Sequence, residues 1–207
     1  MDDKHYDFDS GDVCLDFANT SDWHASERPQ ENLASYDDLV TWGEQAGILS
    51  EEQAGRLRHS AAQQPEDAAG VFHQAITLRE AIYRIFSSLY AGRPVPPAEL
   101  RLLNAELTKA MPYLELRVQE DGIGWRWSEG GAGLDRMLWP VARAAAQLLT
   151  SDHLDRVREC EDERGCGYLF IDQSKNRSRR WCSMDSCGNR AKARRHYARQ
   201  QDQRAEL

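Results

Sequence analysis

Apolar residues recur every three or four positions along most of the first 150 residues, which is the spacing of amphipathic helices. The clearest stretch follows Pro65, which suits a first helical turn, and continues to Tyr90. Cap and breaker residues divide the remainder into separate segments. The pattern predicts helices over 35–46, 50–64, 65–90, 98–110 and 134–149, with Pro140 as a kink in the last one.

Two short stretches alternate with a period of two instead. Residues 113–118 and 123–127 follow this pattern, and Glu120-Asp121-Gly122 between them supplies a turn, so a β-hairpin is predicted. Near the start of the chain, Val13, Cys14, Leu15 and Phe17 favour a short strand or extended segment. A glycine-rich loop is expected at 130–133.

These elements predict the α+β fold class, with a predominantly helical N-terminal domain that contains the β-hairpin. Near residues 150–154 the sequence turns from Ala- and Leu-rich to charged and cysteine-bearing, which places a domain boundary there. We therefore expect one domain over residues 1–150 and a small C-terminal domain over residues 151–207, the latter ending in a helix.

The composition is that of a protein with a buried core, at 41% hydrophobic and 29% charged residues. No apolar run approaches the roughly 20 residues of a membrane span. The start of the chain, Met1-Asp2-Asp3-Lys4-His5, lacks the apolar segment of a secretory signal. We expect a cytoplasmic protein with no membrane association.

The net charge of −8 hides a strong asymmetry between the two ends of the chain. Residues 1–150 carry a net charge of −11, whereas residues 151–207 carry +3. Between Lys175 and Arg199, nine basic residues face Asp185 alone. The overall acidity argues against nucleic-acid binding, but the basic C-terminal tip indicates a local surface for an anionic partner.

Four of the five cysteines lie within 28 residues, in the pattern Cys160-x5-Cys166, then Cys182-x4-Cys187. Four thiolates complete the tetrahedral shell of a structural Zn²⁺ ion, and glycines beside Cys166 and Cys187 allow tight turns. A segment of about 55 residues has little apolar area, so the metal would supply much of its folding energy. Free cysteines or a disulfide pair are the alternatives.

Candidate catalytic groups are scarce by comparison. His153 and His196 could compete as ligands, but four cysteines already fill the shell, so both are expected at the surface or next to the site. Cys14 is expected to be a buried small residue. The sequence shows no Ser/His/Asp set and no phosphate-binding glycine loop, so we do not expect an enzyme.

The segment from Phe170 to Met184, followed by Cys187-Gly188-Asn189-Arg190, resembles the CGNR zinc finger, which is named after that four-residue run. The resemblance extends over residues 160–197. Upstream, residues 11–20 (GDVCLDFANT) are similar to the start of the ABATE domain that commonly precedes this finger. The resemblance implies a bacterial, DNA-binding, stress-induced transcription regulator whose N-terminal domain senses a ligand or stress signal.

The residues of the tip are compatible with DNA binding. The segment after Cys187 has no helix breaker, and Arg190 and Arg194 share one helix face. Such a helix can enter a major groove, where arginine recognises guanine and Asn189 adenine, while loop arginines contact phosphates. The candidate nucleic-acid-binding residues are Lys175, Asn176, Arg177, Arg179, Arg180, Asn189, Arg190, Lys192, Arg194 and Arg195.

Two functional interpretations remain open. In the first, the protein binds double-stranded DNA, and a small-molecule effector acts on the N-terminal domain. The small footprint of one tip favours a homodimer. In the second, the zinc-stabilised tip is a protein–protein interaction module, and its arginines are solvated or pair with the acidic body. RNA is disfavoured because the tip has few aromatic residues for stacking.

Overall fold

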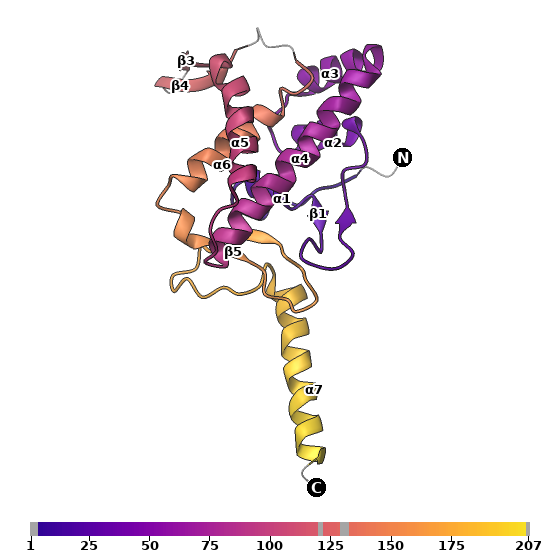
Figure 1. The fold of residues 1–207 in the computed structure, drawn as a ribbon, viewed down its shortest axis with the longest axis vertical. Coiled ribbons are helices and arrows are strands. Elements are labelled where there is room, and N and C mark those ends of the chain that lie inside the picture. Colours follow the sequence, from indigo (N-terminus) through magenta and orange to yellow (C-terminus); the bar gives the residue numbers. More distant parts are fainter. Residues whose placement is uncertain (1–3, 120–121, 129–132, 206–207) are drawn as a thin grey trace.

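The computed structural model describes residues 4–119, 122–128 and 133–205 and has the predicted α+β class, with helices predominating (Figure 1). The N-terminal region contains α2 (Tyr36–Gln45), α3 (Glu51–Gln63), α4 (Pro65–Tyr90), α5 (Pro97–Ala110) and α6 (Leu138–Leu149). Their buried faces meet around α4, and the largest fully buried side chains there include Phe17, Trp42, Phe86 and Met137. None of the described helices is long and apolar enough to cross a bilayer.

The predicted starts of α2, α3 and α4 are confirmed, whereas the last predicted helix begins at Leu138 instead of residue 134. Ser35 accepts a hydrogen bond from the Asp38 amide, and Ser50 forms a capping box with Gln53. Pro65 occupies the first turn of α4, as predicted. Pro140 is the third residue of α6, where its missing N–H costs no helical hydrogen bond, so the predicted kink is wrong.

The strand predicted around Val13–Leu15 is also wrong, because this segment is the helix α1 (Val13–Ala18). Asp12 caps it by accepting a hydrogen bond from the Cys14 amide at 3.0 Å. Cys14, Leu15, Phe17 and Ala18 are fully buried in the main core. Because this turn and a half is buried on nearly every side, including at Asp16, it has no polar stripe from which the helical periodicity could be read.

The predicted hairpin is confirmed, with β3 (Leu114–Gln119) and β4 (Gly122–Trp127) paired antiparallel from Leu114–Trp127 to Gln119–Gly122. Its base packs on α6, where Tyr113 stacks on Trp139. The turn residues 120–121 and most of the expected loop at 130–133 lie outside the described residues. A second two-stranded sheet joins β1 (Ser21–Asp22) to β2 (Gln30–Glu31).

The C-terminal region starts with the hairpin of β5 (Val157–Glu159) and β6 (Leu169–Ile171). Val157 and Leu169 belong to the same hydrophobic core as the helices. The Asn19 side chain exchanges two hydrogen bonds with the backbone of Leu169, at 2.8 and 2.9 Å, and the Ile171 amide donates to the Ser10 carbonyl at 2.7 Å. These contacts join α1 to the C-terminal hairpin. The division into domains at residues 150–154 stays a prediction.

A single π-helical turn, η3 (Met184–Gly188), leads into α7 (Asn189–Ala205). Figure 1 shows α7 extending away from the rest of the molecule, at the end opposite to β3 and β4. The terminal helix predicted from the absence of breakers is therefore present, and most of its length projects beyond the body.

Candidate metal centre and basic tip

The four clustered cysteines converge on one point from four separate segments. Cys160 follows β5, Cys166 lies in a glycine-flanked turn, Cys182 ends the long loop after β6, and Cys187 belongs to η3. Their Sγ atoms all lie within 4.8 Å of one another, with Cys166 to Cys182 at 3.8 Å and Cys182 to Cys187 at 3.6 Å.

This geometry fits a structural zinc ion. Four sulfurs bound at about 2.3 Å in a tetrahedron would lie roughly 3.8 Å apart, close to the separations found here. Around the cluster, Phe170 is fully buried, and Tyr168 and Trp181 pack against it, which makes a small core beside the cysteines. Because four thiolates fill a tetrahedral shell, zinc held by them would act as a cross-link between the four segments.

The turn around Cys166 fits tightly against residues 23–26 of the N-terminal region. Gly165 and Gly167 both have positive φ, and a Cβ on either would lie within 2.7 Å of the backbone of Ala25 or Ser26. The His24 amide donates to the Cys166 carbonyl at 3.1 Å. The two glycines are therefore required both by backbone conformation and by this close approach.

Asp162, which lies between Cys160 and Cys166 in the sequence, forms ion pairs with three arginines. Its side chain is fully buried and accepts hydrogen bonds from Arg164, Arg190 and Arg194 at 3.1 to 3.3 Å. Burial raises the pKa of Asp162, but these guanidinium contacts outweigh it and hold the pKa well below its ordinary range. Asp162 thus fixes the first turns of α7 to the cysteine segment.

Arg190 of the CGNR run connects three parts of the molecule. Besides Asp162, it donates a hydrogen bond to the Cys187 sulfur at 2.9 Å, and its guanidinium lies 5.3 Å from the centre of the Trp23 ring. Arg164 covers the same ring at 4.8 Å. Trp23 itself has φ of 54°, a conformation that bulky residues rarely adopt, so surrounding contacts must hold it there.

Several other predicted nucleic-acid-binding residues are engaged within the tip. The Arg179 guanidinium donates to the carbonyls of Trp181 and Cys182 and lies 4.5 Å from the Phe170 ring centre. Arg180 pairs with Glu161, and Arg177 pairs with Asp155. The last two pairs are exposed, so water screens them and a phosphate could replace the carboxylate at small cost.

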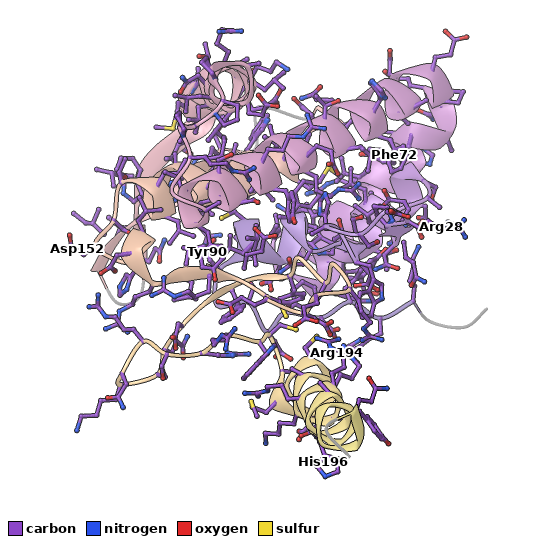
Figure 2. The ribbon with its side chains drawn as sticks, turned by 60° about the horizontal axis from the view of Figure 1, so that its bottom comes forward. Arg28, Phe72, Tyr90, Asp152, Arg194 and His196 are labelled. Carbon is purple, nitrogen blue, oxygen red and sulfur yellow. The ribbon has the colours of Figure 1, made fainter. Side chains whose placement is uncertain are left out.

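The remaining candidates point into solvent. Lys175 and Asn176 lie in the exposed loop after β6, and Lys192 and Arg195 lie on the outer surface of α7. Within the part of the chain that the structure describes, neither lysine has an ion-pair partner. Asn189 is exposed at the start of α7, 3.4 Å from the Asp185 carbonyl. Figure 2 shows Arg194 on the side of α7 that faces the body and His196 on the opposite side.

Asp162 was not singled out from the sequence, and Trp23 stood out only as one of several tryptophans that could lie in the core or line a pocket. An acidic residue between two cysteines that precede a basic helix was the available signal for Asp162. For Trp23 no local signal exists, because its partners Arg164 and Arg190 lie more than 140 residues further along the chain. His153 and His196 are exposed, as expected.

Two family models match the chain. The ABATE model, described as "Putative stress-induced transcription regulator", matches residues 11–152, and the model of the CGNR zinc finger matches residues 156–200. Neither description is that of an enzyme family. No curated protein matches the sequence. The match over residues 11–152 covers more than half of the chain, so the protein belongs to the ABATE family and carries a CGNR zinc finger with four cysteines placed for structural zinc.

Proposed function

We propose that this protein is a cytoplasmic, non-enzymatic transcription regulator whose zinc-stabilised tip binds double-stranded DNA. One observation carries the proposal: α7 projects from the body with Lys192 and Arg195 exposed, while Arg190 and Arg194 hold its first turns against the cysteine cluster. A rigid, cationic helix of this kind has the diameter to enter a major groove.

The contacts within the tip lead us to propose a separate role for each group of candidate residues. Because Arg190, Arg194 and Arg179 are engaged inside the tip, we propose that they shape the DNA-binding surface without reading bases. Lys192, Arg195 and Asn189 are the candidates for contacts in the groove. Lys175, Asn176, Arg177 and Arg180 on the adjoining loop are the candidates for contacts with phosphates and sugars.

The charge distribution favours an approach to DNA in which α7 comes first. The first 150 residues have a net charge of −11, and α7 is the part of the molecule furthest from α3 and the β3–β4 hairpin in Figure 1. The polyanion would repel the body and attract the tip, which selects an end-on approach.

Fluorescence anisotropy of the zinc-loaded full-length protein with random-sequence duplex DNA tests this proposal. Contacts with about five phosphates would give a slope of log affinity against log salt of about −4 to −5. The double variant K192A/R195A should bind more weakly, and K175A/R177A, which removes two of the proposed phosphate contacts, should lower the magnitude of the slope by about 2. The matched control R93A/R101A removes two exposed cations from the body and should leave both quantities unchanged.

An alternative function keeps the zinc tip as a protein–protein interaction module. It is favoured by one observation, the pairing of Arg177, Arg180 and Arg194 with carboxylates of the same region. Absence of DNA binding at low salt, by protein that contains one zinc per chain, would reject the regulator proposal and leave this alternative.

We further propose that a hollow between the two matched regions is where an effector acts. Its volume is about 470 Å³, within the range of small-molecule sites, and its lining includes Asp12 from the cap of α1, Gln147, Arg156 and Ile171. Arg156 and the apolar wall favour a small organic acid. Such an acid should raise the melting temperature of the wild-type protein and not that of R156A. Equal shifts in both would reject this site.

A further inference from the structure

The β3–β4 hairpin presents a sheet face made entirely of apolar side chains. The paired strands place Leu114 opposite Trp127, Leu116 opposite Trp125, and Val118 opposite Ile123. Because side chains alternate across a strand and directly paired residues share a face, these six lie on one side of the hairpin. Glu115, Arg117, Gln119 and Arg126 lie on the other side.

The base of this face is covered, and further out Trp125 has a charged neighbour, the Arg143 guanidinium of α6 at 5.6 Å from its ring centre. Leu114 and Trp127 are half-buried, and Trp127 lies 5.8 Å from Trp139 of α6, measured between ring centres. Towards the tip, the exposed fraction is 59% for Leu116, 53% for Trp125, 75% for Ile123 and 86% for Val118. Alternation along the two strands predicts the hairpin but not what covers its apolar face, so the exposure of Trp125 and its neighbours needs a separate explanation.

We infer that this face, which we call the hairpin face, is the contact surface between two copies of the chain. The four side chains at its tip expose on the order of 400 Å². Two such faces in contact would remove about 800 Å² from water before adjoining surface is counted. This approaches the roughly 1,000 Å² of a weak but specific protein interface.

A second copy is the occupant that matches the chemistry of the hairpin face. The face has no charged or hydrogen-bonding group in its outer two pairs apart from the Trp125 ring N–H, so its partner must also be apolar and of similar width. Within the described part of the chain, the hairpin groups four exposed large apolar side chains on one face, whereas α5 exposes two, Leu100 and Leu102. A two-fold axis would bring two identical hairpin faces together.

The position of the hairpin makes this contact accessible. Figure 1 shows β3 and β4 at one extremity of the molecule, with α7 at the other, so two bodies can meet through their hairpins without collision between the tips. The charged residues of the hairpin lie on its opposite face, where Arg117 pairs with Glu115 at 2.7 Å. The inference does not depend on DNA binding.

Light scattering coupled to size-exclusion chromatography, without DNA, tests it. The wild-type mass should rise from 23.6 kDa towards twice that value between about 1 and 200 µM protein, as expected for an interface of this size. Val118→Arg should remain at the monomer mass throughout. Gln119→Arg adds the same charge to the next residue, on the opposite face, and should associate like the wild type.

Val118 is so exposed that its replacement removes no buried contact, and equal melting temperatures of the two variants would confirm that both are folded. A wild-type protein that stays at 23.6 kDa at 200 µM would overturn the inference and assign the hairpin face to a different partner. Association of Val118→Arg at the wild-type concentration would overturn it as well, because the contact would then lie elsewhere.

Discussion

At the scale of single residues, the Asp16 carboxyl lowers the stability of the fold when it is ionised. It is buried on α1, and burial raises its pKa to about 6 despite a hydrogen bond from the Ser10 amide at 3.1 Å. In the unfolded chain the pKa of aspartate is about 3.9. The folded state therefore binds the proton more tightly, and the contribution of Asp16 to stability falls as pH rises from about 4 to about 6.

Asp16→Asn should accordingly stabilise the protein. Asparagine is uncharged at every pH and can still accept the hydrogen bond from Ser10. We expect the gain in unfolding free energy to grow from about 1 kcal/mol at pH 5 to roughly twice that at pH 8. Urea unfolding of both proteins at the two pH values measures it. A gain that is equal at both pH values would mean that ionisation of Asp16 is not the cause.

Arg190 is the residue whose structural role differs most from the one expected of it. Its hydrogen bond to the Cys187 sulfur and its contacts with Asp162 and Trp23 place it beside the metal centre. Partners of metal ligands typically change metal affinity 10- to 100-fold. Arg190→Ala should therefore release zinc to a chromogenic chelator at least about tenfold faster than the wild type.

Arg195→Ala provides the control for this measurement. Arg195 lies on the same helix, but it is exposed and its guanidinium contacts the Ala191 carbonyl and the Trp181 ring instead of a cysteine. Its replacement should leave zinc release unchanged. Equal rates of zinc release in both variants would show that Arg190 does not support the cysteine ligand.

The sequence predicts the cysteine site better than the environment of the arginines, for a physical reason. Zinc coordination restricts ligand type and local spacing, and both are visible along the chain. The contacts of Arg190 and Arg194 with Asp162 span 28 and 32 residues and depend on how the loop returns to α7. No local pattern distinguishes an arginine that is fixed in this way from one that stays exposed, such as Arg195.

At the scale of elements, the prediction from sequence succeeded for elements that have one face towards water. Helices α2 to α6 and the β3–β4 hairpin have one apolar side, so their period could be read from the sequence. Helix α1 is buried all round, and its cap residue Asp12 was the only usable signal. The contact of α1 with β6 could not be predicted either, because the two elements are about 150 residues apart in the sequence.

The contact between α1 and β6 is a specific target for mutation. Asn19 satisfies both backbone groups of the fully buried Leu169. Asn19→Ala would leave this N–H and C=O without partners and should lower the unfolding free energy by about 2–3 kcal/mol. Asn104→Ala, at an exposed position on α5, should change it by less than about 0.5 kcal/mol in the same urea titration. A similar, small effect of both changes would reject a docking role for Asn19.

At the scale of the whole molecule, zinc removal should affect more than the finger. The turn at Gly165–Gly167 packs against Ala25 and Ser26, and Cys166 accepts a hydrogen bond from the His24 amide. After chelation, hydrogen exchange should become faster in residues 160–188 and also in residues 20–26, while α3 keeps its protection. Changes confined to residues 160–188 would show that the finger and body are not coupled.

The acidic body and basic tip could be predicted from charge alone, whereas the shared core could not. Val157 and Leu169 lie beyond the composition change at residues 150–154, yet they pack with the helices of the N-terminal region. The amino-acid composition of a segment is dominated by its solvent-facing residues, so two buried residues change it little. The sequence therefore indicated a separate tip and gave no sign of its attachment.

The placement of α7 and of the β3–β4 hairpin at opposite extremities has a consequence for how the proposed dimer would meet DNA (Figure 1). If the two-fold axis runs across the long axis of the molecule, two copies joined through their hairpin faces would direct their α7 helices outwards, away from each other. Such a dimer would not read two half-sites one helical turn apart, as compact dimeric repressors do. With both tips bound to DNA, such a dimer would hold two separate duplex segments. On one long DNA molecule, it would therefore close a loop between two distant sites.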